Sequence, residues 1–206
     1  MPMWNELPLQ QLVLRLAAMV IIAGVHGIAV AASAVALGDP GPRYDGRLRF
    51  NPLIHLDLLG TASGVLFAVG WIKPIAVDPA LLRPGRIGLV AVVIAGAAAT
   101  LACALVLRFV RPLLLPLLGD FAAQTTFALI ETIGQLSVWF ALLNVLPLPN
   151  LTGGHLLTAI APQWREGLRR SQPYADVVLI ILAALGFVTG ALEDANRVLS
   201  RIVLGG

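Results

Sequence analysis

Residues 12–37 read LVLRLAAMVIIAGVHGIAVAASAVAL, an apolar stretch in which Arg15 is the only charged residue. A helix rises 1.5 Å per residue, so about 20 apolar residues cross the roughly 30 Å hydrocarbon core of a bilayer. Three further stretches are apolar and long enough for this, namely 87–107, 121–146 and 174–192. The first stretch therefore predicts a membrane-spanning helix, and the others predict that the chain crosses the membrane several times.

The composition of the chain supports the same fold class. Hydrophobic residues make up 58% of the 206 residues and charged residues 12%, whereas about a quarter of the residues are charged in an ordinary soluble domain. The 14 basic residues are spread along the chain, which excludes the basic stripe of a nucleic-acid-binding protein. We predict an all-α integral membrane protein, one membrane domain over residues 1–206, whose surroundings are the lipid bilayer and not a nucleic acid.

Two apolar pieces are too short to be assigned as spans from length alone. Residues 58–72 and 156–161 are shorter than a bilayer crossing requires, so we expect a polytopic bundle of four to six membrane helices. The alternation in 46–50 predicts a short strand, and two prolines in 71–79 exclude a continuous helix there. We therefore expect short strand-like or re-entrant segments after the first helix.

The third long stretch places one carboxylate inside the membrane. Gln124, Glu131 and Gln135 share one helical face, and a carboxylate in mid-span must face protein or water, or be neutral. One interpretation is a groove or proton site, in a small transporter or proton-conducting protein that uses Glu131. The other is a neutral Glu131 that hydrogen-bonds to a neighbouring helix such as the one with Thr100.

Five short motifs follow one another in a recognisable order. They are VHGIAV at 25–30, GDP at 38–40, GRLRFNPLIHLD at 46–57, GWIKPIAV at 70–77 and NVLPLPNLTGGH at 144–155. Together they resemble a compact bacterial and archaeal branch of the site-2 protease family, the intramembrane zinc metalloproteases of peptidase family M50. The resemblance implies a multi-pass protein of the inner (cytoplasmic) membrane of a prokaryote. That family carries His-Glu-x-x-His on an early membrane helix, and Asn-x-x-Pro followed by Leu-Asp-Gly later in the chain.

The catalytic positions of that family are mostly replaced in this chain. Carried over by position, the first histidine is His26, the glutamate is Gly27, the second histidine is Val30 and the aspartate is Thr152. In the family the histidines and the aspartate hold zinc and the glutamate is the general base. Glycine and valine have no side-chain donor atom, and the threonine hydroxyl is neutral. We therefore expect no catalytic residue, no zinc and no other cofactor, and hence an inactive protease homologue.

An active enzyme with an unorthodox metal site is the alternative. The chain has three histidines, His26, His55 and His155, which are the weak candidates for a rebuilt zinc site. The family pattern itself carries histidine at the positions of His55 and His155, so neither needs a new metal to explain it. On this alternative the protein would be a zinc-dependent intramembrane metalloprotease.

This chain retains more of the residues that hold a substrate in that family than of the residues that cut it. The resemblance implies that Asn144 lies beside the site and helps to hold an unwound partner backbone, and Pro147 and Pro149 break the helix after it. Glu131 joins them as a candidate partner-binding residue. We expect a pseudoprotease that binds transmembrane segments of other integral membrane proteins, as a regulatory or accessory subunit of a membrane complex. A purely structural alternative is that Asn144 only caps a helix end.

Overall fold

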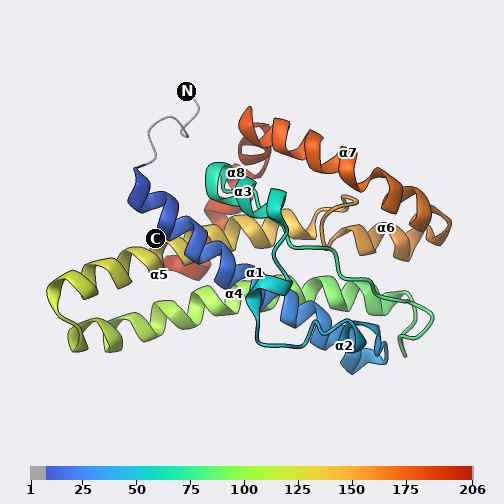
Figure 1. Cartoon of the computed structure of the whole chain (residues 1–206), viewed down its shortest axis with the longest axis horizontal. Helices are drawn as coiled ribbons and strands as arrows, with labels where there is room; N and C mark the ends of the chain where they lie inside the picture. The colour runs from blue at the N-terminus through green and yellow to red at the C-terminus, as the bar shows by residue number, and fades with distance from the viewer. Residues whose placement is uncertain (1–7, 206) are drawn as a thin grey trace.

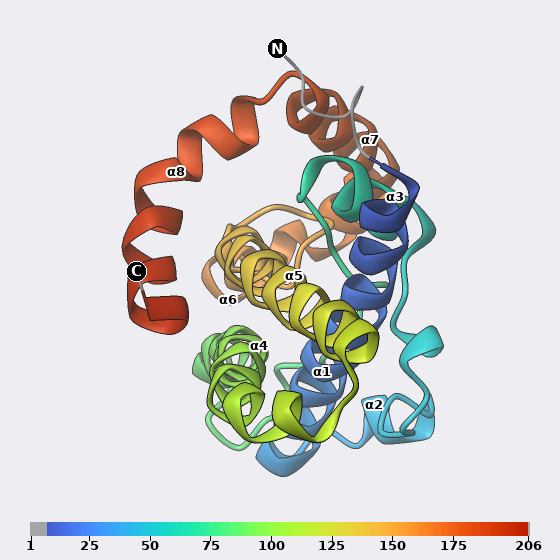
Figure 2. The ribbon, with the colours of Figure 1, turned by 90° about the vertical axis from the view of Figure 1, so that its left-hand side faces the viewer.

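Three long helices form the centre of the protein. The computed structural model describes residues 8–205. In this part of the chain, α1 (Leu9–Leu37), α4 (Ile87–Leu114) and α5 (Asp120–Val145) are apolar enough to cross a membrane. α4 and α5 lie side by side along the long axis of the molecule, and α1 runs obliquely across them (Figures 1 and 2). The protein is thus an all-α polytopic membrane protein, as predicted.

The shorter elements fill the connections between these helices and the end of the chain. Between α1 and α4 lie α2 (Gly41–Tyr44), η2 (Pro52–Ile54) and α3 (Leu58–Phe67), and η3 (Leu115–Leu117) joins α4 to α5. After α5 come α6 (Gly154–Ile160), η4 (Pro162–Trp164), α7 (Arg165–Ala184), α8 (Phe187–Ser200) and the short π-helix η5 (Arg201–Gly205).

The predicted fourth span is not one straight helix. The stretch 174–192 is divided between α7 and α8, and the helices on the two sides of the break differ in direction by 73°. Gly186 lies at this break with φ of +76°, a conformation that glycine adopts without strain. The described residues therefore contain three candidate spans, or four if the bent pair counts as one. This agrees only with the lower end of the predicted four to six.

The segment between α1 and α4 matches the sequence prediction in part. Residues 46–50 form turns, so the predicted strand is wrong there; Gly46 has φ of +70°, which turns the chain. Residues 73–78 are extended, as predicted, and the only bridge among the described residues pairs Leu56 with Ile72. The apolar piece 58–72 is not a span, because α3 ends at Phe67.

This segment reaches deep into the bundle because α1 has glycines there. A Cβ at Gly24 would lie 2.9 Å from Cβ of Pro52, and a Cβ at Gly27 would overlap the ring of His55. Both glycines lie near the middle of α1, so the chain returns from α2 to about half the length of the bundle before α3 begins (Figure 1). Residues 46–57, and not the short apolar piece 58–72 for which the sequence left this possibility open, therefore form a re-entrant segment.

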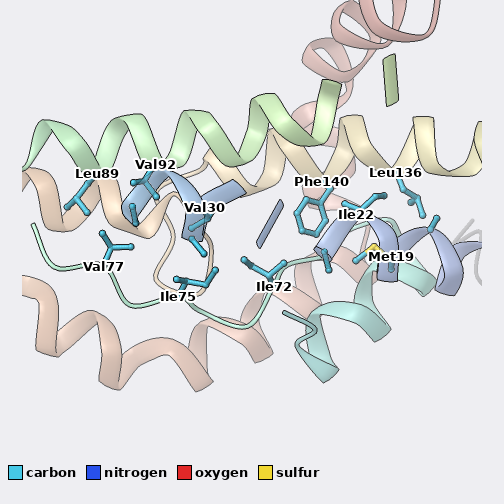
Figure 3. Close-up of a cluster of buried hydrophobic side chains, with 14 of the residues drawn as sticks. Met19, Ile22, Val30, Ile72, Ile75, Val77, Leu89, Val92, Leu136 and Phe140 are labelled. Carbon is cyan, nitrogen blue, oxygen red and sulfur yellow. The ribbon is translucent and has the colours of Figure 1, made fainter. Parts of the chain in front are cut away.

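We call residues 70–78 the extended segment. The largest hydrophobic core lies between α1, α4, α5 and this extended segment. Figure 3 shows Ile22 and Val30 of α1 among Val92 of α4, Phe140 of α5 and Ile75 of the extended segment. All of these side chains are buried. The extended segment thus covers one side of α1 and is held there by apolar packing.

The packing of α3 on the extended segment gives a test of the fold. A Cβ at Gly60 would lie 2.5 Å from the Trp71 carbonyl oxygen and 2.8 Å from Cδ1 of that buried ring. Gly60→Ala should therefore lower the free energy of unfolding by about 1–3 kcal/mol. Gly167→Ala is the matched control, because a Cβ there meets nothing within 4 Å. Thermal unfolding in detergent measures both, and equal midpoints would contradict this packing.

Candidate functional site

His26 is the centre of the site that the sequence predicted. It lies on α1, is fully buried, and its two ring nitrogens contact two threonines. Nδ1 lies 3.0 Å from Oγ1 of Thr100 on α4, and Nε2 lies 2.9 Å from Oγ1 of Thr152 in the loop after α5. The ring of Phe140 on α5 meets the imidazole edge to face, with centroids 5.1 Å apart. Three helices and one loop therefore meet at this histidine.

The hydrogen bonds assign the tautomer of His26. The Thr100 hydroxyl donates to the Gly96 carbonyl oxygen at 2.8 Å, and a hydroxyl has only one hydrogen to donate. Thr100 must then accept the hydrogen of Nδ1. A charged imidazole that is buried without a counter-ion is costly, so the ring is neutral. Its Nε2 then accepts the hydroxyl hydrogen of Thr152, which engages the lone pair available to a metal.

The position of the family's glutamate is filled by another side chain. A Cβ on Gly27 would overlap the His55 imidazole, so only glycine fits between α1 and this ring. His55 is fully buried, and neither of its ring nitrogens has a hydrogen-bond partner among residues 8–205. Gly27 offers no carboxylate at this position, and the His55 imidazole occupies the space beside its backbone.

The position of the second histidine is occupied by Val30, an apolar side chain that packs on α4. Val30 is buried, and a Cβ on Gly96 of α4 would lie 2.7 Å from its Cγ2 and 2.8 Å from Cε1 of His26. Small residues at such a contact let two membrane helices approach closely. The α1–α4 contact therefore covers both His26 and Val30, and Val30 contributes only apolar atoms.

The loop after α5 brings Thr152 to His26. The helix ends at Val145, and the Gly153 N–H donates to the Asn144 carbonyl oxygen at 2.7 Å. A Cβ on Gly153 would overlap the Val145 and Leu146 carbonyl groups, so the loop can fold back over the helix end only with glycine there. The residues at the degenerate positions, His26, Val30 and Thr152, are consequently neighbours of one site.

These residues do not fit a zinc ion. Catalytic zinc takes three protein ligands, drawn from histidine, cysteine and carboxylates, and His26 is the single such residue among the four motif positions. Residues 8–205 contain no group of three or more His, Cys, Asp or Glu side chains that could hold a metal ion. The structure therefore does not gather His26, His55 and His155 into the rebuilt ligand set that the sequence left open.

His155 lines a cavity next to the site. The cavity has a volume of about 260 Å³ and lies between the extended segment, the loop after α5, α6 and α7. Val30 and Thr152 also line it, so the degenerate site and the cavity are continuous. Burial lowers the pKa of His155 to about 4, and its side chain is therefore neutral at pH 7.

Asn144 connects the extended segment to α5. Its Nδ2 donates to the carbonyl oxygens of Gly70 at 3.0 Å and Phe140 at 2.9 Å, and its buried Oδ1 has no partner among the described residues. Pro147 follows the end of α5, where the helix breaks as predicted. Pro149 lines the cavity, and its carbonyl oxygen accepts a hydrogen bond from Gln172.

Glu131 bonds to α4, the helix that contains Thr100, as one interpretation expected, although its partner is a cation and not a group that pairs with a neutral acid. Its carboxylate forms an ion pair with Arg111 of α4, and the Arg111 guanidinium lies 5.1 Å from the centroid of the Phe127 ring. Glu131 does not line the cavity beside His26. The sequence analysis missed this partner because α4 continues beyond the apolar stretch to Leu114 and so includes Arg111.

Sequence reasoning also missed the roles of Gly96 and His55 around His26. The run of small residues at 95–99 is a sequence signal for close packing of α4 on another helix. Nothing in the spacing identified α1 and His26 as the partners. The contact of His55 with Gly27 could not be predicted from the sequence either, because it depends on the path that residues 46–57 take back to α1.

Comparison with known proteins gives one similarity over most of the chain. The chain is 30% identical over 166 residues to a Bacillus subtilis (strain 168) protein named "Putative zinc metalloprotease YwhC". The match covers 77% of this chain and 74% of that relative. No protein-family model and no solved structure matches the chain.

The contact of Gly27 with His55 predicts a coupled effect on stability. Gly27→Ala should destabilise the protein by about 1–3 kcal/mol, because the new methyl group overlaps a buried ring. His55→Ala removes that ring and should suppress the penalty in the double variant. The coupling free energy from a double-mutant cycle, measured by unfolding in detergent, should favour the double variant by about 0.5–3 kcal/mol. Additive effects would show that the two residues are not in contact.

Proposed function

The chain belongs to the same family as the Bacillus subtilis protein named "Putative zinc metalloprotease YwhC", and we propose that it is a site-2-protease-like member that binds transmembrane segments without cutting them. The observation that supports inactivity is the engagement of both His26 nitrogens by threonine hydroxyls. The partner is another integral membrane protein, and the protein acts as a regulatory or accessory subunit in the inner membrane of a prokaryote.

Loss of hydrolysis follows from what the site must supply. In a zinc peptidase the metal polarises the carbonyl group and generates the nucleophile from water, and a carboxylate takes its proton. At the corresponding positions this chain offers Gly27, which has no side chain, and Val30, which has only apolar atoms. Neither residue can hold a metal or move a proton, so no hydrolytic step starts from these side chains.

The extended segment beside the cavity supports the proposal of partner binding. The N–H groups of Ala76 and Val77 make no backbone hydrogen bond to any described residue, and both residues line the cavity. Non-helical backbone at membrane depth is tolerated where it is buried in protein or lines a cavity. Successive N–H groups of an extended backbone point to opposite edges, so a partner backbone that adds as a strand to one edge would satisfy the one of these groups that points toward it.

Two features would position such a partner. Asn144 fixes the start of the extended segment through the Gly70 carbonyl oxygen, so the edge is held rigidly against α5. At the other end of the segment, Asp39 accepts a hydrogen bond from the Asp78 N–H at 2.8 Å. The free edge between these two anchors is thus pre-organised, which lowers the entropic cost of binding.

One reporter experiment tests binding and inactivity together. A photo-crosslinking residue replaces Ala76 in the full chain, which is expressed in membranes with a single-span reporter whose transmembrane segment contains a helix-breaking Asn-Pro pair. We expect a crosslink to the reporter from position 76, and full-length reporter with the wild-type chain. Val90 is the control position, since it is exposed on α4 and belongs to neither the cavity nor the extended segment.

The two parts of the proposal fail separately in this experiment. Cleavage of the reporter by the wild-type chain, abolished by His26→Ala, would show an active protease and refute the inactive interpretation. Crosslinking from position 76 that is no stronger than from position 90 would refute binding at the extended edge. A zinc-dependent site-2 protease that cuts the same reporter serves as the positive control for cleavage.

A further inference from the structure

Loops from several parts of the chain meet at one end of the bundle, where α1 ends and α4 begins. The Arg83 N–H donates to the Leu37 carbonyl oxygen at 2.8 Å, so the residues before α4 lie against the end of α1. The Asp78 N–H donates to the buried Asp39, and the Asp78 carboxylate lies 3.7 Å from the guanidinium of Arg165, the first residue of α7. Figure 1 shows α2, α6 and the beginning of α7 at this same end.

Arginine side chains gather at this end of the bundle. Three of them, in the first turns of α7, form ion pairs with acidic neighbours. The other three, in α2 and just before α4, are exposed and form no ion pair with any residue in the described range 8–205. Asp45 is the exposed acid beside them, so an excess of positive charge is left. The six arginines that define this basic end are Arg43, Arg83, Arg86, Arg165, Arg169 and Arg170.

Aromatic and apolar side chains are exposed among these arginines. Tyr44 of α2 is 82% exposed, Ile87 at the start of α4 is 75% exposed and Trp164 before α7 is 54% exposed. The span α1 ends here and the span α4 begins here, so this is the level at which the chain leaves the hydrocarbon. Tyrosine and tryptophan are enriched at that level in membrane proteins. The basic end therefore lies among the lipid headgroups, with its apolar side chains toward the acyl chains.

The arginines of α4 at the opposite end of the bundle are bound by the chain itself. Arg108 and Arg111 lie in the last two turns of α4, roughly 30 Å from Ile87 at a rise of 1.5 Å per residue. Arg108 donates to the Val203 carbonyl oxygen at 3.1 Å, and Arg111 forms the ion pair with Glu131. The two ends of the bundle thus differ, because the basic end presents guanidinium groups that no described acid pairs with.

We propose that the basic end binds the phosphate groups of anionic phospholipids in the surrounding leaflet, through the guanidinium groups of Arg43, Arg83 and Arg86. A guanidinium group holds a phosphate by two parallel hydrogen bonds. The phosphates of a leaflet lie where the spans leave the hydrocarbon, which is the level of these three side chains. The exposed Tyr44 and Ile87 beside them contact the acyl chains of the same lipids.

The same surface orients the chain in the membrane. A span at 58–72 would place Arg43 and Arg83 on opposite sides, but α3 ends at Phe67 and the two arginines lie at one end of the bundle. Lysine and arginine accumulate in cytoplasmic loops, and the cytoplasmic leaflet has a negative surface potential. The basic end therefore faces the cytoplasm, and η3 between α4 and α5 faces the other side.

The lipid surface goes beyond the proposed function and is independent of it. None of Arg43, Arg83 and Arg86 lines the cavity beside His26. Cleavage of a reporter or a missing crosslink from position 76 would leave the lipid surface unchanged. Loss of lipid binding would likewise leave the inactive interpretation unchanged.

Lipid binding to the purified full chain tests the surface. Native mass spectrometry in detergent compares phosphatidylglycerol, which is anionic, with phosphatidylcholine, which is zwitterionic. We expect tighter binding of phosphatidylglycerol. The variant Arg43→Gln/Arg83→Gln/Arg86→Gln should bind it about 100-fold more weakly, which corresponds to about 1 kcal/mol for each lost charge.

The variant Arg43→Lys/Arg83→Lys/Arg86→Lys is the matched control, because it keeps the three charges and should keep the preference for phosphatidylglycerol. Since the three side chains are exposed, both variants should unfold at the wild-type temperature in detergent without lipid. Equal binding of the two lipids, or unchanged binding by the glutamine variant, would overturn the lipid surface. Displacement of the lipid by an equal concentration of inorganic phosphate would overturn it too, since a free anion would then be the ligand.

Labelling of single cysteines in spheroplasts tests the orientation. In a background with Cys103→Ser, which removes the chain's single cysteine, Pro84→Cys probes the basic end. Gly119→Cys probes the connection between α4 and α5, where a Cβ meets nothing within 4 Å. A maleimide that does not cross membranes should label position 119 in intact spheroplasts, and position 84 only after lysis. Labelling of position 84 from outside would overturn the cytoplasmic placement.

Discussion

The absence of a side chain at Gly27 is the constraint on which the rest of this structure depends. Because a Cβ there would overlap His55, glycine lets the re-entrant segment lie against the middle of α1. The His55 carbonyl oxygen then accepts the Lys73 N–H at 2.8 Å, which aligns the extended segment, and Asn144 fixes the same segment at Gly70. Gly27, the residue at which the resemblance to site-2 proteases implies a general base, thus also positions the cavity wall.

Around His26, hydroxyl groups and close packing are found where the resemblance to site-2 proteases implies a metal ion. A structural zinc ion contributes on the order of 10–16 kcal/mol to a fold, whereas one buried hydrogen bond contributes about 0.5–1.5 kcal/mol. The two threonine contacts therefore contribute less to the stability of the fold than a bound metal ion would. The remaining stability comes from packing, with Gly96 against Val30 and the Phe140 ring against the imidazole. Such a site favours one fixed arrangement of α1, α4 and α5.

The sequence predicted the parts of the fold that depend on length and composition. The three long spans follow from long apolar stretches with at most one charged residue each, and the end of α5 before Pro147 follows from the chemistry of proline. The break at Gly186 was missed because the apolar stretch continues through it, and Pro173 lies inside α7 instead of ending it. The strand expected at 46–50 was wrong because Gly46 turns the chain, although the residues alternate as in a strand.

For the candidate site, the sequence predicted some of the residues that lie together but not their contacts with distant segments. The resemblance placed His26, Val30 and Thr152 at one site, and the structure brings these three residues together. Motif spacing contains no information about contacts between distant segments, so it could not place Thr100 on Nδ1 of His26 or His55 against Gly27. The partner of Glu131 was missed for a local reason, because Arg111 follows the apolar stretch but still belongs to α4.

The zinc content of the purified protein tests the central claim most directly. The full chain, purified without chelators, is analysed for zinc by inductively coupled plasma mass spectrometry beside the His26→Ala variant. The structure predicts far less than one zinc ion per chain, with no difference between the two proteins, because the imidazole of His26 is already engaged by Thr100 and Thr152. One zinc ion per wild-type chain that is lost in the variant would contradict the account.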